Sequence, residues 1–261
     1  MSEPTLPLLH ERDGAIARIR FNRPQVLNAI DAAMACAFRD ACRAIANDPE
    51  VRVVVLSGEG RAFMAGGDVA QFRDDPASIA PSLIDPMHEG LRLLTELRVP
   101  VIASLHGAVA GAGLSLALAC DLAIAAEGTR FNFAYTKLGA SCDLGASWSL
   151  PRLIGLRRAL EIALLCDTLD TADAHRLGVV NRVVPPAALA EETERLAARL
   201  VSGPPVANGW LKRLMRESLS RDLGAQLDAE RHGFAACAAT RDFGEAVAAF
   251  LEKRPANYLG S

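Results

Sequence analysis

Hydrophobic and polar positions follow two different periods in the first two thirds of the chain. Residues 15–22 alternate apolar and polar side chains, which predicts a half-buried strand. Residues 51–58 form a short, almost wholly apolar run rich in valine, which is typical of a strand buried on both faces. Further short apolar runs predict strands over residues 101–107, 122–126 and 179–184.

Apolar residues at helical spacing lie between these strands. Asp31 is the predicted N-cap of a helix over residues 31–47. Asp85-Pro86 is predicted to be an N-cap followed by proline at the first helical position. The same spacing predicts helices over residues 155–165, 171–177 and 186–201.

The pattern changes after Gly203-Pro204-Pro205, which is predicted to be a hinge. Residues 206–251 show only helical periodicity. We therefore predict a β/α core over residues 1–200 and a helical C-terminal region over residues 201–261.

Composition and charge exclude several classes of protein. The chain has 261 residues, of which 51% are hydrophobic and 23% charged, so it can bury a sizeable core. Its 28 basic and 31 acidic residues give a net charge of −3, which argues against nucleic acid as a partner. No apolar run is long enough to span a bilayer, and the first residues do not resemble a signal peptide.

Cysteine and histidine usage indicates neither disulfides nor a metal centre. The six cysteines lie far apart with no C-x-x-C pair, which is typical of reduced thiols in a cytoplasmic enzyme. There is no H-E-x-x-H motif or Cys/His cluster, so no metal site is expected.

Two glycine-rich loops could carry chemistry. The first, residues 62–68, follows a predicted buried strand, and its adjacent Gly66 and Gly67 let a ligand approach the backbone closely. The second, residues 107–115, passes from a strand into a helix, where the first N–H groups lack partners inside the helix. Such a loop can hold a phosphate or an oxyanion, although its spacing differs from the dinucleotide-binding G-x-G-x-x-G.

The order and spacing of six segments resemble the crotonase (enoyl-CoA hydratase/isomerase) superfamily from about residue 8 to residue 258. These segments are Arg23-Pro24 with Asn28-Ala29, AFMAGGDV at 62–69, HGAVAGAGLSLALACDLAIAA at 106–126, LPRLIGLRRALE at 150–161, LGVVNRVVP at 177–185 and AFLEKR at 249–254. The resemblance implies an α/β fold, a crotonase-like spiral of β-β-α units with a C-terminal helical trimerisation region. It also implies a homotrimer or a dimer of trimers.

The resemblance implies an acyl-CoA thioester substrate and formation of a thioester enolate. Backbone N–H groups of Gly67 and Ala112 are then expected to hold the thioester oxygen as an oxyanion hole. No metal or redox cofactor is expected, because coenzyme A is part of the substrate. Phe250 and Lys253 would reach the CoA from a neighbouring subunit, although a lysine there could also be an ordinary solvated one. The full set expected to bind substrate or CoA is Arg23, Asn28, Ala65, Gly66, Asp68, Gly111, Tyr135, Phe250 and Lys253.

Asp143 is the residue to which we assign acid–base catalysis. Family hydratases carry two glutamates at the positions of Ser115 and Tyr135, and neither residue here can replace a carboxylate. A single acid at Asp143 suffices to move a double bond from the 3- to the 2-position of an enoyl-CoA. Tyr135 could line the acyl pocket or bond Asp143, and Asp143 could instead cap a helix that begins at Leu144. The apolar neighbours expected to raise the pKa of Asp143 are Phe63, Phe131, Phe133, Leu144 and Trp148.

Other functions remain open on the sequence alone. One is 2-enoyl-CoA hydration, and another is a dehalogenase like that for 4-chlorobenzoyl-CoA, with Asp143 as nucleophile assisted by His88. A third is a hydrolase similar to the α/β-hydrolases. Ser115, in a turn close to G-x-S-x-G, would be its nucleophile, and Asp170 and His175 would complete the catalytic triad. A fourth is a protein that binds acyl-CoA but has lost catalysis.

Overall fold

A computed structural model describes residues 6–73 and 75–261 of the chain. Its main sheet has six strands in the order β1-β2-β3-β4-β6-β8, and only the edge pair of β1 and β2 is antiparallel. These strands are β1 (Leu8–Asp13), β2 (Ile16–Phe21), β3 (Val53–Gly58), β4 (Val101–Leu105), β6 (Leu122–Ala126) and β8 (Arg182–Val184). A small parallel pair, β5 (Ala108–Ala110) and β7 (Arg130–Asn132), lies apart from this sheet. The predicted α/β fold is thus confirmed.

The five predicted strands are present, four of them within two residues of their predicted bounds and the last at half its predicted length. The last begins at Arg182 rather than 179, because Val179 and Val180 are buried in the turn before it. The edge strand β1 has no counterpart among the predicted elements. Only Leu8 of its six residues is buried, so its sequence lacks the alternation that marked its neighbour β2.

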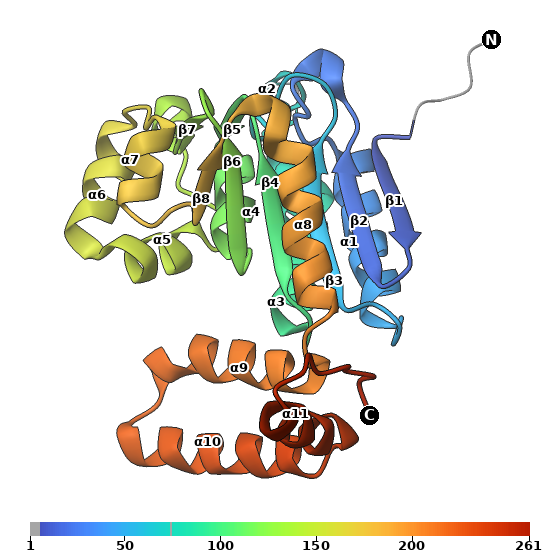
Figure 1. The fold of residues 1–261 in the computed structure, drawn as a ribbon. Coiled ribbons are helices and arrows are strands. Elements are labelled where there is room, and N and C mark those ends of the chain that lie inside the picture. The colour runs from blue at the N-terminus through green and yellow to red at the C-terminus, as the bar shows by residue number, and fades with distance from the viewer. Residues whose placement is uncertain (1–5, 74) are drawn as a thin grey trace.

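Helices cover both faces of the sheet (Figure 1). α1 and α3 pack on one face, and α8 packs against β3, β4 and β6 on the other. Val54 and Leu56 of β3 pack in the hydrophobic cluster that includes residues of α1 and α3. Val53 and Val55 pack in the cluster on the other face, which includes residues of α8. Burial on both faces explains why residues 51–58 read as a continuous apolar run.

The helices of this core largely match the predicted ones. They are α1 (Ala32–Ala46), α2 (Val69–Phe72), α3 (Asp85–Glu96), α4 (Ala112–Ala119), α5 (Ala146–Ile154), α6 (Leu156–Leu165), α7 (Thr171–Arg176) and α8 (Leu189–Val201). Asp31 caps α1 as predicted, accepting a hydrogen bond from the Met34 N–H at 2.8 Å. The prediction that Asp85 is an N-cap was wrong, because a π-helical turn (Ala80–Ile84) precedes it and Asp85 is itself helical. The short helix α2 and the proline-containing α5 were not predicted.

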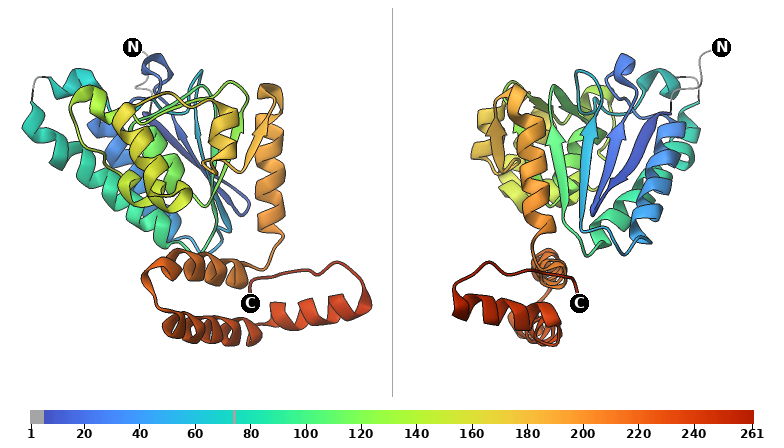
Figure 2. Two further views of the ribbon diagram at one scale, coloured as in Figure 1. Left: turned by 90° about the vertical axis from the view of Figure 1, so that its left-hand side faces the viewer. Right: turned by 45° about the vertical axis from the view of Figure 1, so that its right-hand side comes forward.

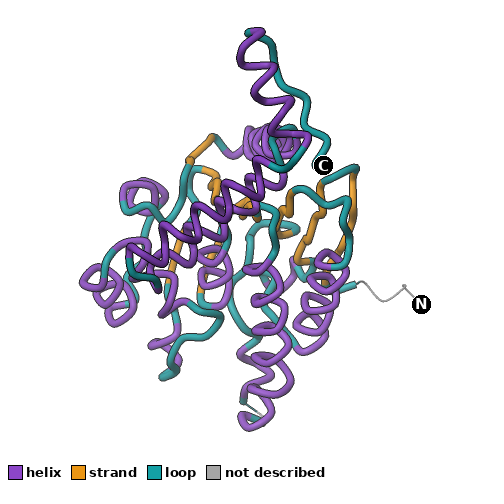
Figure 3. The backbone as a smooth tube through the Cα atoms, turned by 90° about the horizontal axis from the view of Figure 1, so that it is seen from below, coloured by secondary structure: helices purple, strands orange, loops and turns teal. Residues whose placement is uncertain are grey.

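Three helices form a separate layer at one end of the core: α9 (Pro205–Glu217), α10 (Leu223–Ala238) and α11 (Arg241–Glu252) (Figures 1 and 2). The chain enters this layer through the predicted hinge, and Pro205 is the first residue of α9. Seen from below, the helix before the C-terminal tail extends beyond the outline of the core (Figure 3). The tail returns to the core, where Arg52 donates a hydrogen bond to the Leu259 carbonyl at 2.7 Å.

Asp121 joins this helical layer to the sheet. Its carboxylate lies 2.8 Å from Lys212 Nζ and 2.6 Å from an Arg216 nitrogen, both on α9, and accepts the Val101 N–H at 2.8 Å. The Lys212 side chain is only 7% exposed, and its burial lowers the pKa of its ammonium group, an effect that Asp121 opposes. Asp121 is thus a structural carboxylate rather than an acid–base group.

We predict that Asp121→Asn destabilises the protein by about 3–5 kcal/mol, because it leaves the buried Lys212 cation without its counterion. Urea unfolding measures this loss, and limited proteolysis should show earlier cleavage between α8 and α9. The matched control is Asp173→Asn, which removes an exposed ion pair with Arg176 and should cost at most about 1 kcal/mol. Equal effects of the two changes would contradict this role of Asp121.

Candidate functional site

The two glycine-rich loops lie against each other. Met64 donates its N–H to the Ala108 carbonyl at 3.1 Å, and Ala110 donates to the Met64 carbonyl at 2.9 Å. A Cβ atom added to Gly107 would lie 2.0 Å from the Arg61 carbonyl oxygen, and one added to Gly113 would lie 2.3 Å from that of Met64. Larger residues at these two positions would therefore force the loops apart.

Gly67 presents its own N–H away from the neighbouring chain segment. The Gly66 carbonyl accepts the Ile30 N–H at 2.8 Å, and the Asp68 N–H donates to the Ile30 carbonyl at 2.9 Å. In this parallel bridge Ile30 pairs with the Gly66 carbonyl and the Asp68 N–H. The N–H and carbonyl of Gly67 itself point away from Ile30. Nothing in residues 6–73 and 75–261 accepts a hydrogen bond from the Gly67 N–H.

Ala112 provides a second open N–H on the adjacent loop. It is the first residue of α4, where an N–H has no partner inside the helix, and no other acceptor among the described residues bonds it. A Cβ on Gly66 would lie 3.4 Å from the Ala110 carbonyl oxygen and 3.9 Å from the Ala112 nitrogen. Two unpaired N–H groups on touching loops, one at a helix N-terminus, form an arrangement able to bind an oxyanion.

Asn28 holds the first loop in place. Its side chain is completely buried and donates to the carbonyls of Glu59, Ala62 and Phe63 at 2.9, 2.8 and 3.1 Å. Its side-chain oxygen accepts the Arg23 N–H at 2.8 Å. The buried amide of Asn28 therefore positions the loop, and the expected contact of Asn28 with CoA stays a prediction.

Arg23 and Asp68 clamp the same loop from outside. The Arg23 guanidinium lies 3.1 Å from Asp68 and 3.2 Å from Asp31, and donates to the Ala29 carbonyl at 2.6 Å. The side chains of Arg23 and Asp68 remain partly exposed, at 16% and 17%. Asp68 therefore fixes the loop, and a CoA contact by Arg23 stays a prediction.

The remaining predicted loop residues lie where the two loops meet. Ala65 donates its N–H to the Leu27 carbonyl at 3.0 Å. Gly111 has a φ of 51° and a ψ of −122°, a conformation that glycine adopts readily, and donates its N–H to the Asn132 carbonyl at 3.0 Å. A Cβ on Gly111 would lie 3.5 Å from the Gly66 Cα, so the glycines of the two loops face each other.

Asp143 is hydrogen-bonded to Tyr135, which lies within hydrogen-bond distance of Ser115. The Tyr135 hydroxyl donates to Asp143 Oδ1 and lies 2.8 Å from Ser115 Oγ. Ser115 Oγ in turn lies 3.2 Å from the Gly111 carbonyl oxygen. Burial raises the pKa of Tyr135, and the nearby Asp143 charge raises it further, so the phenol stays protonated and remains a donor.

The Asp143 side chain does not cap a helix. Gly145 is the N-cap of α5, and among the described residues the hydrogen bond from this helix to Asp143 goes to its backbone carbonyl, which accepts the Ala146 N–H at 3.1 Å. The helix-cap alternative for the carboxylate was therefore wrong. Its predicted apolar neighbours Phe63, Phe131, Phe133 and Leu144 are all buried in one core cluster, and Phe133 packs edge-to-face on Tyr135.

His88 lies close to Asp143, but its ring supports the backbone. Its Nε2 accepts the Leu144 N–H at 3.1 Å, which requires a neutral ring with the proton on Nδ1. Leu144 has a φ of 48°, a left-handed conformation that is costly for a leucine. His88 thus helps to hold the strained turn that carries Asp143.

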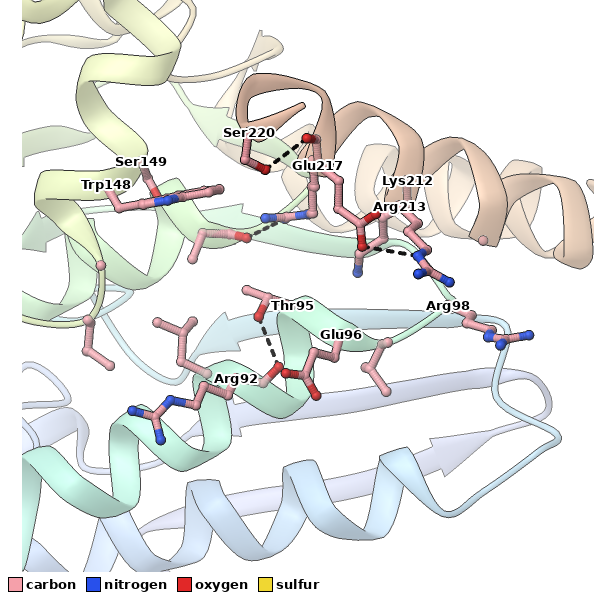
Figure 4. Close-up of a pocket in the computed structure, with 17 residues that line it drawn as sticks. Arg92, Thr95, Glu96, Arg98, Trp148, Ser149, Lys212, Arg213, Glu217 and Ser220 are labelled. Carbon is pink, nitrogen blue, oxygen red and sulfur yellow. Dashed lines mark hydrogen bonds and ion pairs between the residues drawn. The ribbon is translucent and has the colours of Figure 1, made fainter. Parts of the chain in front are cut away.

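A cavity of about 630 Å³ opens beyond Leu144 and Gly145, between the core and α9 (Figure 4). Thr95 and Glu96 of α3 and Trp148 of α5 form part of its wall, and Lys212 and Arg213 of α9 lie opposite α3. Trp148 is 46% exposed and Arg152 stacks 4.2 Å from its ring, so it lines this cavity rather than the surroundings of Asp143.

Phe250 and Lys253 lie on and after α11, at the opposite end of the molecule from the glycine-rich loops near α2 (Figure 1). Phe250 is 83% exposed, and Lys253 is exposed as well. Neither residue reaches the site of its own chain in this structure. Their predicted contact with CoA therefore requires a second copy of the chain.

The nucleophile-elbow alternative does not fit. Ser115 is completely buried, and Asp170 is the exposed N-cap of α7, accepting the Asp173 N–H at 2.8 Å.

All six cysteines are free, and burial raises the pKa of the Cys120 thiol to about 12. In the described part of the chain, no three His, Cys, Asp or Glu side chains converge on a metal position, and no helix could cross a membrane.

The sequence and the fold of this chain are similar to those of known proteins. A family model described as enoyl-CoA hydratase/isomerase matches residues 11–261. A 1,2-epoxyphenylacetyl-CoA isomerase of Escherichia coli is 34% identical, with 97% of this chain and 98% of the relative covered. A crotonyl-CoA hydratase of Syntrophomonas wolfei is 32% identical, with 97% of both covered. The crystal structure of an enoyl-CoA hydratase from Polaromonas sp. JS666 is 34% identical, covers 96% of this chain and 99% of its own, and has a TM-score of 0.91.

Proposed function

Because the chain belongs to the enoyl-CoA hydratase/isomerase family, we propose that it converts a 3-enoyl-CoA into the conjugated 2-enoyl-CoA. Asp143 is the acid–base of this reaction. The N–H groups of Gly67 and Ala112 hold the thioester oxygen. The reaction needs no metal or redox cofactor, since coenzyme A enters with the substrate.

The observation that carries the proposal is the hydrogen-bonded set of Asp143, Tyr135 and Ser115. Hydration of a 2-enoyl thioester requires one group to activate water and another to protonate carbon, and the resemblance places glutamates for these tasks at Ser115 and Tyr135. Ser115 is a hydroxyl, and burial raises the pKa of the Tyr135 phenol. Asp143 is therefore the one carboxylate among these three side chains. One carboxylate is enough for a proton shift.

The reaction moves one proton between two carbons. Asp143 removes a proton from C2, and the C–H electrons form the C1–C2 double bond of a dienolate while negative charge grows on the thioester oxygen. The two backbone N–H groups bind that oxygen more strongly as its charge increases. Asp143 then gives the proton to C4, which binds it with the C3–C4 π electrons. The C1–C2 π electrons shift to C2–C3, the thioester carbonyl re-forms, and the carboxylate is regenerated.

The proposed assembly is a homotrimer or a dimer of trimers. Its support is the helical C-terminal layer, which exposes large apolar side chains that a single chain leaves uncovered. Those on α9 to α11 include Met215, Leu223, Phe234, Phe250 and Leu251. In such an assembly Phe250 and Lys253 of one chain would contact the CoA bound by another.

An absorbance assay tests the reaction. Purified protein with a 3-enoyl-CoA should generate the absorbance of the conjugated 2-enoyl thioester. Hydratase names among the relatives make hydration the alternative, and it would appear as loss of that absorbance from a 2-enoyl-CoA. Hydration without isomerisation would overturn the proposal. Halide release from 4-halobenzoyl-CoA, or binding without any turnover, would instead support the dehalogenase-like or the non-catalytic alternative.

A further inference from the structure

A continuous chain of hydrogen bonds links Asp143 to the peptide group that carries the Ala112 N–H. It runs from Asp143 Oδ1 through the Tyr135 hydroxyl to Ser115 Oγ at 2.8 Å, and from there to the Gly111 carbonyl oxygen at 3.2 Å. The Gly111 carbonyl and the Ala112 N–H belong to the same peptide unit. The two ends of this chain are therefore the proposed base and one proposed oxyanion donor.

The two hydroxyl groups cannot satisfy every link at once. Each has one proton, and Tyr135 directs its proton to the Asp143 carboxylate, which can only accept. The Ser115 hydroxyl can then donate either to the Tyr135 oxygen or to the Gly111 carbonyl, which already accepts the Ser115 backbone N–H at 3.0 Å. Ser115 is completely buried, so water cannot readily donate to whichever of these two oxygens the hydroxyl does not bond.

We infer that Ser115 is a positioning residue whose hydroxyl proton follows the negative charge from Asp143 to the thioester oxygen. This inference rests on the proposed function. While Asp143 is ionised, Ser115 donates to Tyr135. Once the substrate proton has moved to Asp143, the Ser115 hydroxyl turns to the Gly111 carbonyl and polarises the peptide whose N–H binds the enolate oxygen.

Both ends of this series of hydrogen bonds favour the same rotation of the Ser115 hydroxyl. A phenol that donates to a carboxylate becomes a better acceptor, and it loses this advantage when the carboxylate is neutralised. A peptide whose N–H donates to an oxyanion gains electron density on its carbonyl, which then attracts the serine proton. No bond to hydrogen is broken within the chain, because only the direction of donation changes.

Neighbouring residues hold Tyr135 and Ser115 in the positions that these hydrogen bonds require. The Tyr135 ring packs edge-to-face on Phe133 with centroids 5.2 Å apart, and the preceding Ala134 has a left-handed φ of 61°. His88, a titratable group next to this turn, accepts the Leu144 N–H. Ser115 is held on α4, the helix that begins with Ala112.

The test uses a chromophore that needs no turnover. Oxyanion donors polarise bound 4-(dimethylamino)cinnamoyl-CoA and shift its absorbance to longer wavelength. The shift is measured in the wild type, Ser115→Ala, Asp143→Asn and the double variant. The amide introduced by Asp143→Asn imitates the neutral acid, so removing the Ser115 hydroxyl should reduce the shift more in the Asp143→Asn background than in the wild type. Strictly additive effects would overturn the inference.

Kinetics and a control separate this inference from the proposed function. Ser115→Ala should lower kcat about 3- to 10-fold with unchanged KM, the range expected for one neutral hydrogen bond. Ser104→Ala removes another buried serine, bonded to Thr193 on the far side of the sheet, and should leave both the shift and kcat unchanged. Absence of any shift in the wild type would refute the oxyanion hole itself. A shift with additive variants refutes only the role of Ser115.

Discussion

Asp143→Asn should abolish turnover of a 3-enoyl-CoA while leaving the protein folded and able to bind CoA thioesters. The amide has nearly the same shape and can still accept the Tyr135 hydrogen bond. It cannot accept a proton from carbon. Removing a positioned acid–base group typically costs a factor of about 10² to 10⁴ in rate, so kcat should fall by that amount with little change in substrate affinity.

Stopped-flow absorbance gives kcat, and calorimetry with a saturated acyl-CoA gives affinity in the absence of turnover. Asp167→Asn, an exposed aspartate between α6 and α7, is the matched control and should behave as wild type. Isomerisation by Asp143→Asn at the wild-type rate would show that another group carries the proton. Hydration activity that survives the substitution would point to a water reaction that Asp143 does not serve.

The glycine-rich loops could be located from sequence, because the reason for their glycines is local. Gly107 and Gly113 permit backbone contacts that a side chain would obstruct. The position of Asp143 relative to Tyr135 could not be predicted. It depends on left-handed residues at Ala134 and Leu144, which no residue preference favours.

Asn28 shows a different limit. Its place in a family motif indicated a ligand contact, yet its amide bonds the carbonyls of Glu59, Ala62 and Phe63 and one N–H. A motif identifies residues that matter, but burial decides whether they touch the ligand or hold what does. For Asp121 it is the structure that shows the role, through its contacts with Lys212, Arg216 and the Val101 N–H.

The helical C-terminal layer was predictable as helix but not in its placement. Residues 206–251 carry apolar side chains on more than one face, and in a single chain many of these stay exposed, Leu211 and Met215 of α9 among them. The ion pairs of Asp121 with Lys212 and Arg216 join residues about 90 positions apart in sequence, a separation that periodicity cannot detect.

Ala112→Pro should remove one oxyanion donor with little damage to the fold. Ala112 is the first residue of α4, the helical position that tolerates proline best, and its N–H has no partner among the described residues that could be lost. Loss of one such donor typically costs about 2.7–4 kcal/mol in transition-state stabilisation, so kcat should fall by a factor of about 10² to 10³. The red shift of bound 4-(dimethylamino)cinnamoyl-CoA should shrink with it.

Ala112→Gly is the control, because it keeps the N–H and removes only a methyl group. It should retain most of the activity and the full red shift, whereas Ala112→Pro loses both. Thermal unfolding midpoints of the two variants show whether α4 still forms. Equal losses in both variants would mean that packing at the start of α4, rather than the N–H, limits the reaction. If Ala112→Pro kept both kcat and the red shift, the thioester oxygen could not be held by this peptide.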